Sequence, residues 1–253
     1  MNNLTAFPRI FCVLSVVVLW LSASFGYLIG HKLRPLRKED RGDFGVVQAA
    51  ILTLLGLLIG FTFSMAVSRY DQRKNYEEAE ANAIGTEYVR ADLLPVADAA
   101  RVRDLLRSYL DQRILFYTTR DERELERVNA STAQLQTEMW STVRAHAVGS
   151  PSPVVALAVS GMNDVLNSQG YTQAAWWNRI PVSAWGLMAV LAISCNVLIG
   201  YGAHRKGALL FLVLPLAVSI SFLLISDIDS PRRGMIRVSP QNLISLSQSQ
   251  QAH

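Results

Sequence analysis

Residues 46–95 decide the fold of this chain. The first half, VVQAAILTLLGLLIGFTFSMAV (46–67), is an uncharged apolar run, and the second half, SRYDQRKNYEEAEANAIGTEYVRADLLP (68–95), is rich in charge. The first half is long enough to cross a bilayer, which takes about 20 residues. The second half contains no proline before Pro95 and a single glycine, Gly85. We therefore predict one continuous helix that leaves the membrane and carries on into water.

The composition of the whole chain also indicates a membrane protein. Of its 253 residues 17% are charged and 51% are hydrophobic, whereas about a quarter of a soluble domain is charged. The low charge is concentrated in four apolar runs, so we predict an all-α membrane protein with four transmembrane helices. The predicted spans cover residues 10–30, 46–67, 180–201 and 208–225. A cleaved signal peptide is the alternative for the first run, but this run is longer than a signal sequence requires.

The predicted domains follow from these spans. A transmembrane hairpin (1–68) precedes a helical extramembrane insert (69–179), a second hairpin (180–226) and a polar tail (227–253). In the insert we expect helices up to Leu94, from an Asp98 cap, from 122 to 147, and from 154 to 168 with an end near Gly170. No stretch alternates with period two, so no sheet is predicted. The Ser/Gln-rich end of the tail is expected to fray.

Charge and cysteine usage favour lipid as the surrounding partner and give no sign of nucleic acid. The formal net charge is +4, and basic clusters flank the apolar runs, where they set topology and contact anionic lipid. Cys12 and Cys195 both lie inside apolar runs and imply neither a disulfide framework nor a metal site.

No catalytic motif is present, so we predict no enzyme activity, no catalytic residue, no cofactor and no metal site. The chain has no HExxH, GxSxG, P-loop or dinucleotide-binding glycine pattern. Glu77, Glu78, Glu80 and Glu87 lie on a helix with Arg73, Lys74 and Arg90, which are three or four residues from three of these glutamates. The pattern predicts solvated ion pairs along the helix.

The tail carries a second small group of charges. Asp227 and Asp229 are expected to pair with Arg232 and Arg233 across the turn at Pro231. Two carboxylates are too few to fill a calcium shell of six to eight oxygens.

Two rows on the second span are candidates for function. Gly56, Gly60 and Ser64 form a row of small residues, as Gly26 and Gly30 do on the first span, and such rows let helix backbones approach closely. Thr53, Leu57 and Phe61 form a row about 100° away on the same helix. Either both rows of the second span pack against other spans of the same chain, or at least one row faces away from the chain's own spans.

Two separated motifs, IGFTFSMAVSRYDQRKNYEEAEANAIGTEYVRADLLP (59–95) and DIDSPRRGMIRVS (227–239), resemble the bacterial bestrophin-like family of four-span membrane proteins. More distantly, the chain is similar to the bestrophins, which are pentameric anion channels. The resemblance implies a bacterial inner membrane, a homo-oligomer (a pentamer) and a permeant anion such as chloride. It places Thr53, Leu57 and Phe61 at the pore constriction and Arg69 at the pore mouth. The chain departs from the channel pattern at Thr53, at Asp71 and in its sparse acidic tail, so calcium gating is not expected.

Two functions remain open from the sequence. The first is a homo-oligomeric ion channel whose second span lines the axis. The second is a non-conducting anchored scaffold whose insert binds a partner. The basic residues that flank the spans number seven on one side and eight on the other, which leaves the sidedness open. The resemblance favours a cytoplasmic insert.

Overall fold

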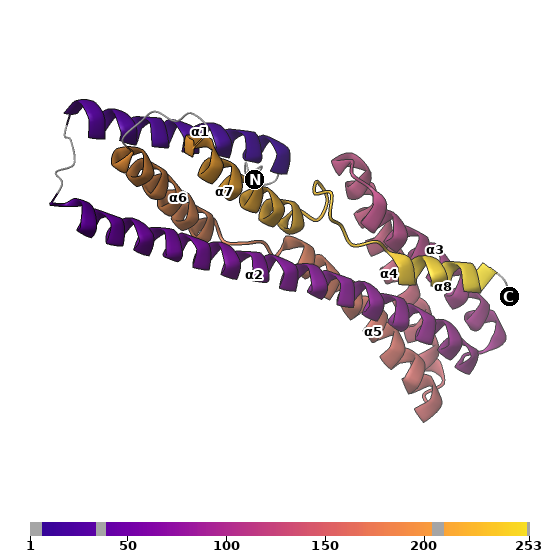
Figure 1. Cartoon of the computed structure of the whole chain (residues 1–253). Coiled ribbons are helices and arrows are strands. Elements are labelled where there is room, and N and C mark those ends of the chain that lie inside the picture. Colours follow the sequence, from indigo (N-terminus) through magenta and orange to yellow (C-terminus); the bar gives the residue numbers. More distant parts are fainter. Residues whose placement is uncertain (1–6, 34–38, 204–209, 252–253) are drawn as a thin grey trace. The chain divides into compact units, whose positions relative to one another are not determined.

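The computed structural model describes residues 7–33, 39–203 and 210–251, and every regular element in these residues is a helix (Figure 1). The predicted all-α fold is therefore confirmed. Four helices are long and apolar enough to cross a membrane, as predicted. The chain forms two compact units, which we call the membrane unit (1–69 and 179–236) and the insert unit (70–178 and 237–253).

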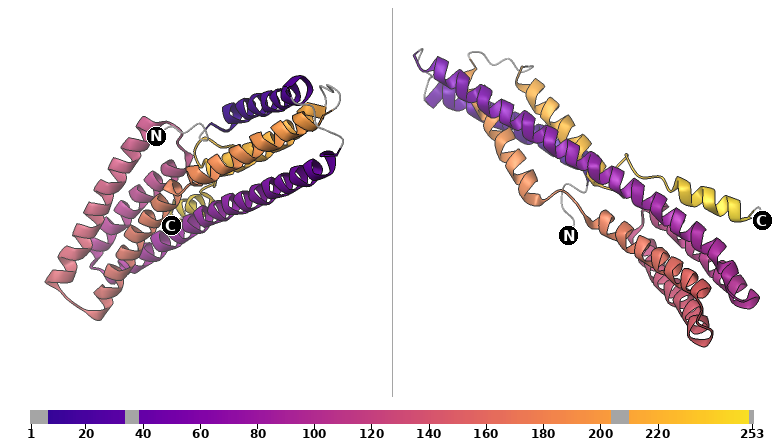
Figure 2. Two further views of the ribbon diagram at one scale, coloured as in Figure 1. Left: turned by 90° about the vertical axis from the view of Figure 1, so that its left-hand side faces the viewer. Right: turned by 90° about the horizontal axis from the view of Figure 1, so that it is seen from below.

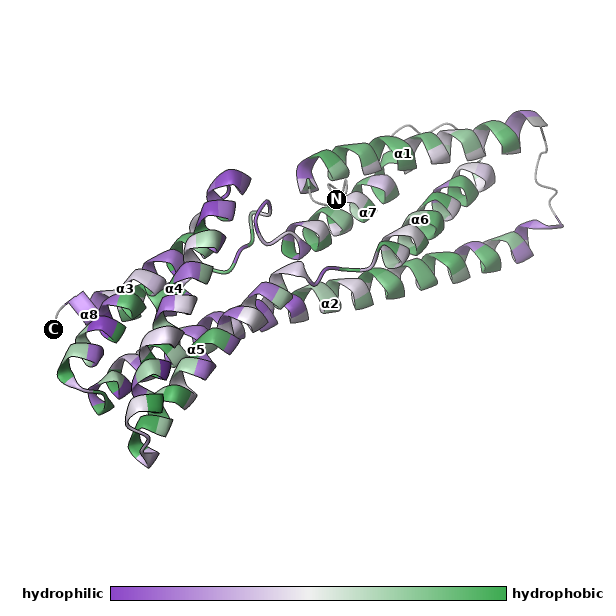
Figure 3. Cartoon of the chain, turned by 180° about the vertical axis from the view of Figure 1, so that it is seen from behind, coloured by the Kyte–Doolittle hydropathy of each residue, from purple (hydrophilic) through white to green (hydrophobic). Residues whose placement is uncertain are grey.

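The membrane unit contains the four apolar helices. They are α1 (Pro8–Leu28), which a π-helical turn (Ile29–Leu33) extends, the first part of α2 (Arg41–Arg90), α6 (Val182–Gly202) and α7 (Leu210–Asp229). Figure 3 shows hydrophobic residues dominating α1, α6, α7 and the first part of α2. The expected basic loop at 31–43, the basic turn at 202–207 and the start of the fourth span lie partly outside the described residues, at 34–38 and 204–209.

Close contact between backbones joins α1 to α6. A Cβ atom on Gly26 would lie 2.0 Å from the carbonyl oxygen of Val197, and one on Gly200 would lie 1.9 Å from that of Ala23. A side chain at either position would therefore push the helices apart. α1 also packs against α7, and the rings of Phe11 and Phe222 stack at 6.1 Å.

α2 is a single helix from Arg41 to Arg90, as predicted from the absence of proline. A 3₁₀ turn (Ala91–Leu93) follows, and Leu94 is extended because it precedes Pro95. The next helix, α3 (Val96–Thr118), begins directly after Pro95. The predicted start at Asp98 is thus wrong by two residues. Pro95 is the residue just before the first helical turn, with its φ fixed at −55°, so Asp98 lies within that turn.

The insert unit consists of the second part of α2 with α3, α4 (Glu122–Gly149), α5 (Pro153–Trp177) and α8 (Gln241–Gln251). Figure 2 shows α3, α4 and α5 as neighbouring helices. The predicted end of α5 near Gly170 is wrong: the helix continues to Trp177, because packing around Thr172 and Trp176 outweighs the cost of one glycine.

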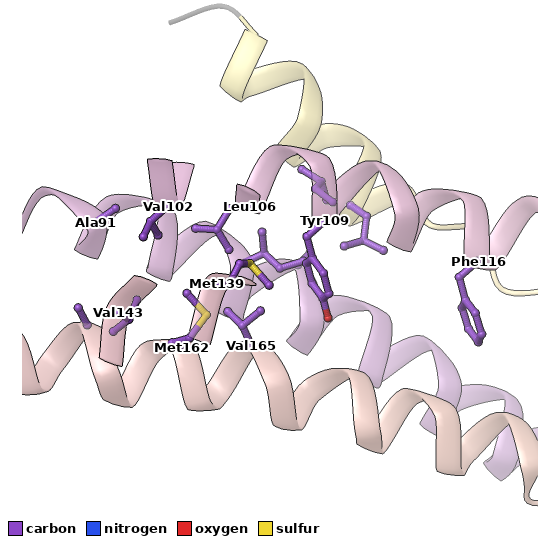
Figure 4. Close-up of a cluster of buried hydrophobic side chains, with 14 of the residues drawn as sticks. Ala91, Val102, Leu106, Tyr109, Phe116, Met139, Val143, Met162 and Val165 are labelled. Atoms are coloured by element: carbon purple, nitrogen blue, oxygen red, sulfur yellow. The ribbon is translucent and has the colours of Figure 1, made fainter. Parts of the chain in front are cut away.

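The core of the insert unit is an apolar cluster between these helices (Figure 4). Leu106 and Tyr109 of α3 face Met139 of α4 and Met162 and Val165 of α5.

A seam of buried, mostly charged residues on α2 lies beside this core. Arg73, Glu77, Glu80, Ile84 and Glu87 recur at intervals of three or four residues, and each is at most 1% exposed. The prediction of solvated ion pairs is therefore wrong for the three buried glutamates, although Glu78 is exposed. Residues at this spacing lie on one side of a helix, so the three glutamates share a face with the core residue Ile84. This face packs against the rest of the insert unit, and the glutamates are buried with it.

Glu77 binds the C-terminal helix α8. Its carboxylate accepts the backbone N–H groups of Asn242 and Leu243, both at 3.0 Å, and the side-chain amide of Asn242 at 2.7 Å. A carboxylate at a helix N-terminus satisfies free N–H groups and complements the helix dipole. The expectation that the end of the tail frays is therefore wrong up to Gln251, and residues 252–253 lie outside the described residues.

Candidate pore-lining helix

The transmembrane part of α2 has one packed side and one exposed side. Leu55, Thr62 and Ala66 are buried, whereas Leu57 is 51% and Phe61 is 61% exposed. Helix positions advance by 100° per residue, which places Leu55 and Thr62 nearly opposite the Thr53–Phe61 row. Most of the apolar surface of this span is thus left uncovered by the chain itself.

The row of small residues also lies on the exposed side of α2. A Cβ atom on Gly56 or Gly60 would meet nothing within 4 Å, and Ser64 is exposed. The alternative that both rows pack within the chain is therefore wrong. The matching pair on α1 behaves differently, because a Cβ on Gly30 would lie 2.4 Å from the carbonyl oxygen of Tyr201.

Thr53 continues the exposed row of Leu57 and Phe61 by one turn. Its hydroxyl donates a hydrogen bond to the carbonyl of Ala49 at 2.8 Å, within the same helix. This internal bond satisfies the hydroxyl donor, so Thr53 can occupy an apolar surface at modest cost.

Arg69, at the end of the span, forms an ion pair. Its guanidinium lies 3.7 Å from the Asp229 carboxylate, and Asp229 also accepts the backbone N–H of Ile180 at 3.2 Å. Three segments that are distant in sequence thus meet at this carboxylate. The sequence pattern held no short-range sign of the contact, which depends on how the spans pack.

Asp227 has a different role from Asp229. It accepts the backbone N–H groups of Met235 and Ile236, both at 2.8 Å, and so closes the turn that follows α7. The guanidinium of Arg233 lies 4.3 Å from the centre of the Phe7 ring. The pairing of Asp227 and Asp229 with Arg232 and Arg233 stays a prediction.

Within the described parts of the chain, no three His, Cys, Asp or Glu side chains are grouped closely enough to hold a metal ion. Cys195 is buried and Cys12 is half-buried, and both are free thiols. The features with functional potential are therefore the exposed face of α2 and the ionic contacts at the end of the span.

Comparison with known proteins agrees with this architecture. Residues 13–243 match the family model of the Bestrophin-like domain. No curated protein matches the chain. The fold is similar to a crystal structure of a bacterial bestrophin homologue from Klebsiella pneumoniae with a point mutation, at 14% identity and a TM-score of 0.63, over 97% of this chain and 98% of that chain. A structure of the Klebsiella homologue solved by zinc phasing gives 15% identity and a TM-score of 0.61, over 94% and 97%.

At these identities the similarity to the solved structures establishes the fold alone. The family model, however, spans most of the chain and includes most of α1, the other three apolar helices and the insert between them. The protein therefore belongs to the bestrophin-like family.

Proposed function

We propose that this protein is the subunit of a homo-oligomeric ion channel in which copies of α2 surround a central axis. The observation that carries the proposal is the exposed face of α2, which lies opposite the side that packs within the chain. A span with one packed and one free apolar side has a surface available for the same helix of a neighbouring copy. Family membership supports the same arrangement.

In an oligomer, the exposed face of α2 would contribute one ring of identical side chains at each level of the axis, and such rings can form a gate. Thr53, Leu57 and Phe61 are four residues apart, so rings from symmetry-related copies would be about 6 Å apart along the axis. Two successive apolar rings form a narrow neck that loses its water easily and thereby blocks ions. The row of Gly56, Gly60 and Ser64 beside it would let adjacent copies of α2 approach closely.

An anion is the permeant ion that we propose. Arg69 follows the apolar rings by two turns and would raise the local anion concentration, although Asp229 offsets part of its charge. The pentameric state, the bacterial inner membrane and the cytoplasmic side for the insert are proposed from the resemblance to bestrophins.

The experiment is single-channel recording from purified protein in planar bilayers, with Phe61→Ala as the test variant. We expect a larger conductance or a constant leak, because the ring at the neck loses most of its volume. Phe25→Ala on α1 is the matched control, since Phe25 is 59% exposed, close to the 61% of Phe61, yet lies on another span. This variant should conduct like the wild type.

A silent wild type, with a Phe61→Ala variant that is silent as well, would overturn the proposal. A monomer in native-like membranes would do the same. The scaffold function, in which the insert recruits a partner protein, would then be the better hypothesis.

A further inference from the structure

Glu87 is a buried carboxyl group that has no hydrogen-bonding partner among the described residues. It lies on the seam of α2 in the insert unit and is fully buried. Neither carboxyl oxygen accepts a hydrogen bond from any described residue. Its neighbours on the seam differ, because Glu80 is bound by Arg113, and Glu77 is bound by the N-terminus of α8. An unsatisfied buried carboxyl group in a folded protein requires an explanation.

Gly161 of α5 provides the space for this carboxyl group. A Cβ atom at Gly161 would lie 2.0 Å from Oε2 of Glu87, so the carboxyl group rests directly against the backbone of α5. Gly161 precedes Val165 by one helical turn, and Val165 belongs to the apolar core of the insert unit. Glu87 therefore forms part of the packing between α2 and α5.

Two charged groups act on Glu87 from the helices on either side of the contact. Burial raises the pKa of Glu87 from 4.5 to about 8, Arg90 of α2 acts against this rise, and Asp164 of α5 adds to it. Asp164 is exposed. On α3, Arg103 donates hydrogen bonds to Asp92 and to the carbonyl of Tyr88, the residue after Glu87.

We propose that Glu87 is a pH-sensitive contact that closes α2 against α5 when its carboxyl group is neutral and opens more easily as the pH rises. A neutral carboxyl group can be buried without a partner at moderate cost, whereas a carboxylate ion requires water. The ionised form therefore favours a locally open state in which water reaches the carboxylate. This inference concerns the insert unit and does not depend on whether the protein conducts ions.

Hydrogen–deuterium exchange of the full-length protein in detergent micelles tests this contact. The wild type is compared with Glu87→Gln at each pH from 5 to 9, so that the chemical exchange rates cancel. The substituted amide side chain has the size of the neutral carboxylic acid and does not ionise. We expect the ratio of wild-type to variant exchange in peptides from residues 80–94 and 155–168 to rise at least tenfold between pH 5 and pH 8, and then to stay level.

Two further variants act on the charge around Glu87 without altering its side chain. Asp164→Asn removes a negative charge, so the rise should level off at a lower pH than in the wild type. Arg90→Gln removes a positive charge, so the rise should continue to a higher pH. A ratio that does not change with pH, or three proteins that level off at the same pH, would overturn the proposal. If Glu87→Gln folds poorly, each charge variant is instead divided by the wild type at every pH, which also cancels the chemical exchange rates. A ratio that stays constant with pH in both variants would then overturn the proposal.

Discussion

Glu80 of α2 and Arg113 of α3 form an ion pair in which neither side chain is accessible to solvent, with Nε and Oε1 2.5 Å apart. Thr172 of α5 donates a further hydrogen bond to Glu80 at 3.1 Å. Burial lowers the pKa of Arg113, but Glu80, Tyr109 and Tyr117 together outweigh this effect, so the pKa of Arg113 is raised and its guanidinium remains charged. One carboxylate thus connects three helices of the insert unit.

Removing one member of this pair should destabilise the insert unit strongly. Glu80→Ala leaves the Arg113 charge buried without a partner, which costs about 3–5 kcal/mol. The measurement is thermal unfolding of the full-length protein in micelles, followed by circular dichroism. Asp104→Ala is the control, because it breaks the exposed Arg107–Asp104 pair, which is worth at most about 1 kcal/mol. Equal effects of the two substitutions would contradict a structural role for the buried pair.

Glu77 should determine whether α8 stays attached. Glu77→Ala removes three hydrogen bonds to the N-terminus of α8, so this helix should separate or unfold. Hydrogen exchange in residues 241–251 should rise by about 5- to 30-fold, since the loss of a charged cap costs roughly 1–2 kcal/mol. Glu78→Ala is the neighbouring control, and its exposed side chain should leave the exchange of α8 unchanged.

The contact between α1 and α6 should not tolerate even a methyl group. Gly26→Ala would place a Cβ atom 2.0 Å from the Val197 carbonyl oxygen, and because this neighbour is backbone, the helices must move apart. We expect a loss of at least about 1–3 kcal/mol, as for other overpacked sites, seen as a lower unfolding temperature in detergent. Gly186→Ala on α6, where a Cβ would meet nothing within 4 Å, should unfold like the wild type.

Asp229 should tune the effect of Arg69 on permeant ions. Under the proposed channel function, Asp229→Asn removes the negative partner of Arg69 and should increase the ratio of anion to cation permeability. Arg69→Gln should decrease this ratio. Reversal potentials in a salt gradient measure both effects. Shifts in the same direction, or no shift in either variant of a conducting protein, would exclude Arg69 from ion selection.

Local rules were sufficient to predict the helical class of the fold, the four spans and the length of α2. An apolar run of about 20 residues is by its length alone sufficient to predict a membrane span. The continuity of α2 followed from the absence of proline, and its end followed from Pro95. These features depend only on neighbours in the sequence.

The features that local rules missed all depend on distant partners. Glu80 lies in a stretch rich in charge, which predicts exposure, and its contacts with Arg113 and Thr172 make its burial tolerable. α8 has few apolar residues, and it forms a helix because Glu77 binds its first turn and Leu243 is buried. The row of Thr53, Leu57 and Phe61 could be recognised in the sequence as a largely apolar stripe. That this stripe is exposed and not packed within the chain could be learned only from the arrangement of the spans.

The bond between Glu77 and Asn242 joins residues 165 positions apart, which constrains how the protein is made. A ribosome adds about 5–20 residues per second, so Glu77 waits roughly 10–30 s for its partner. During this interval the second apolar hairpin has to be synthesised and enter the lipid, while the buried face of the extramembrane part of α2 is still incomplete. The insert unit is therefore completed late, when α8 docks onto helices that were synthesised well before it.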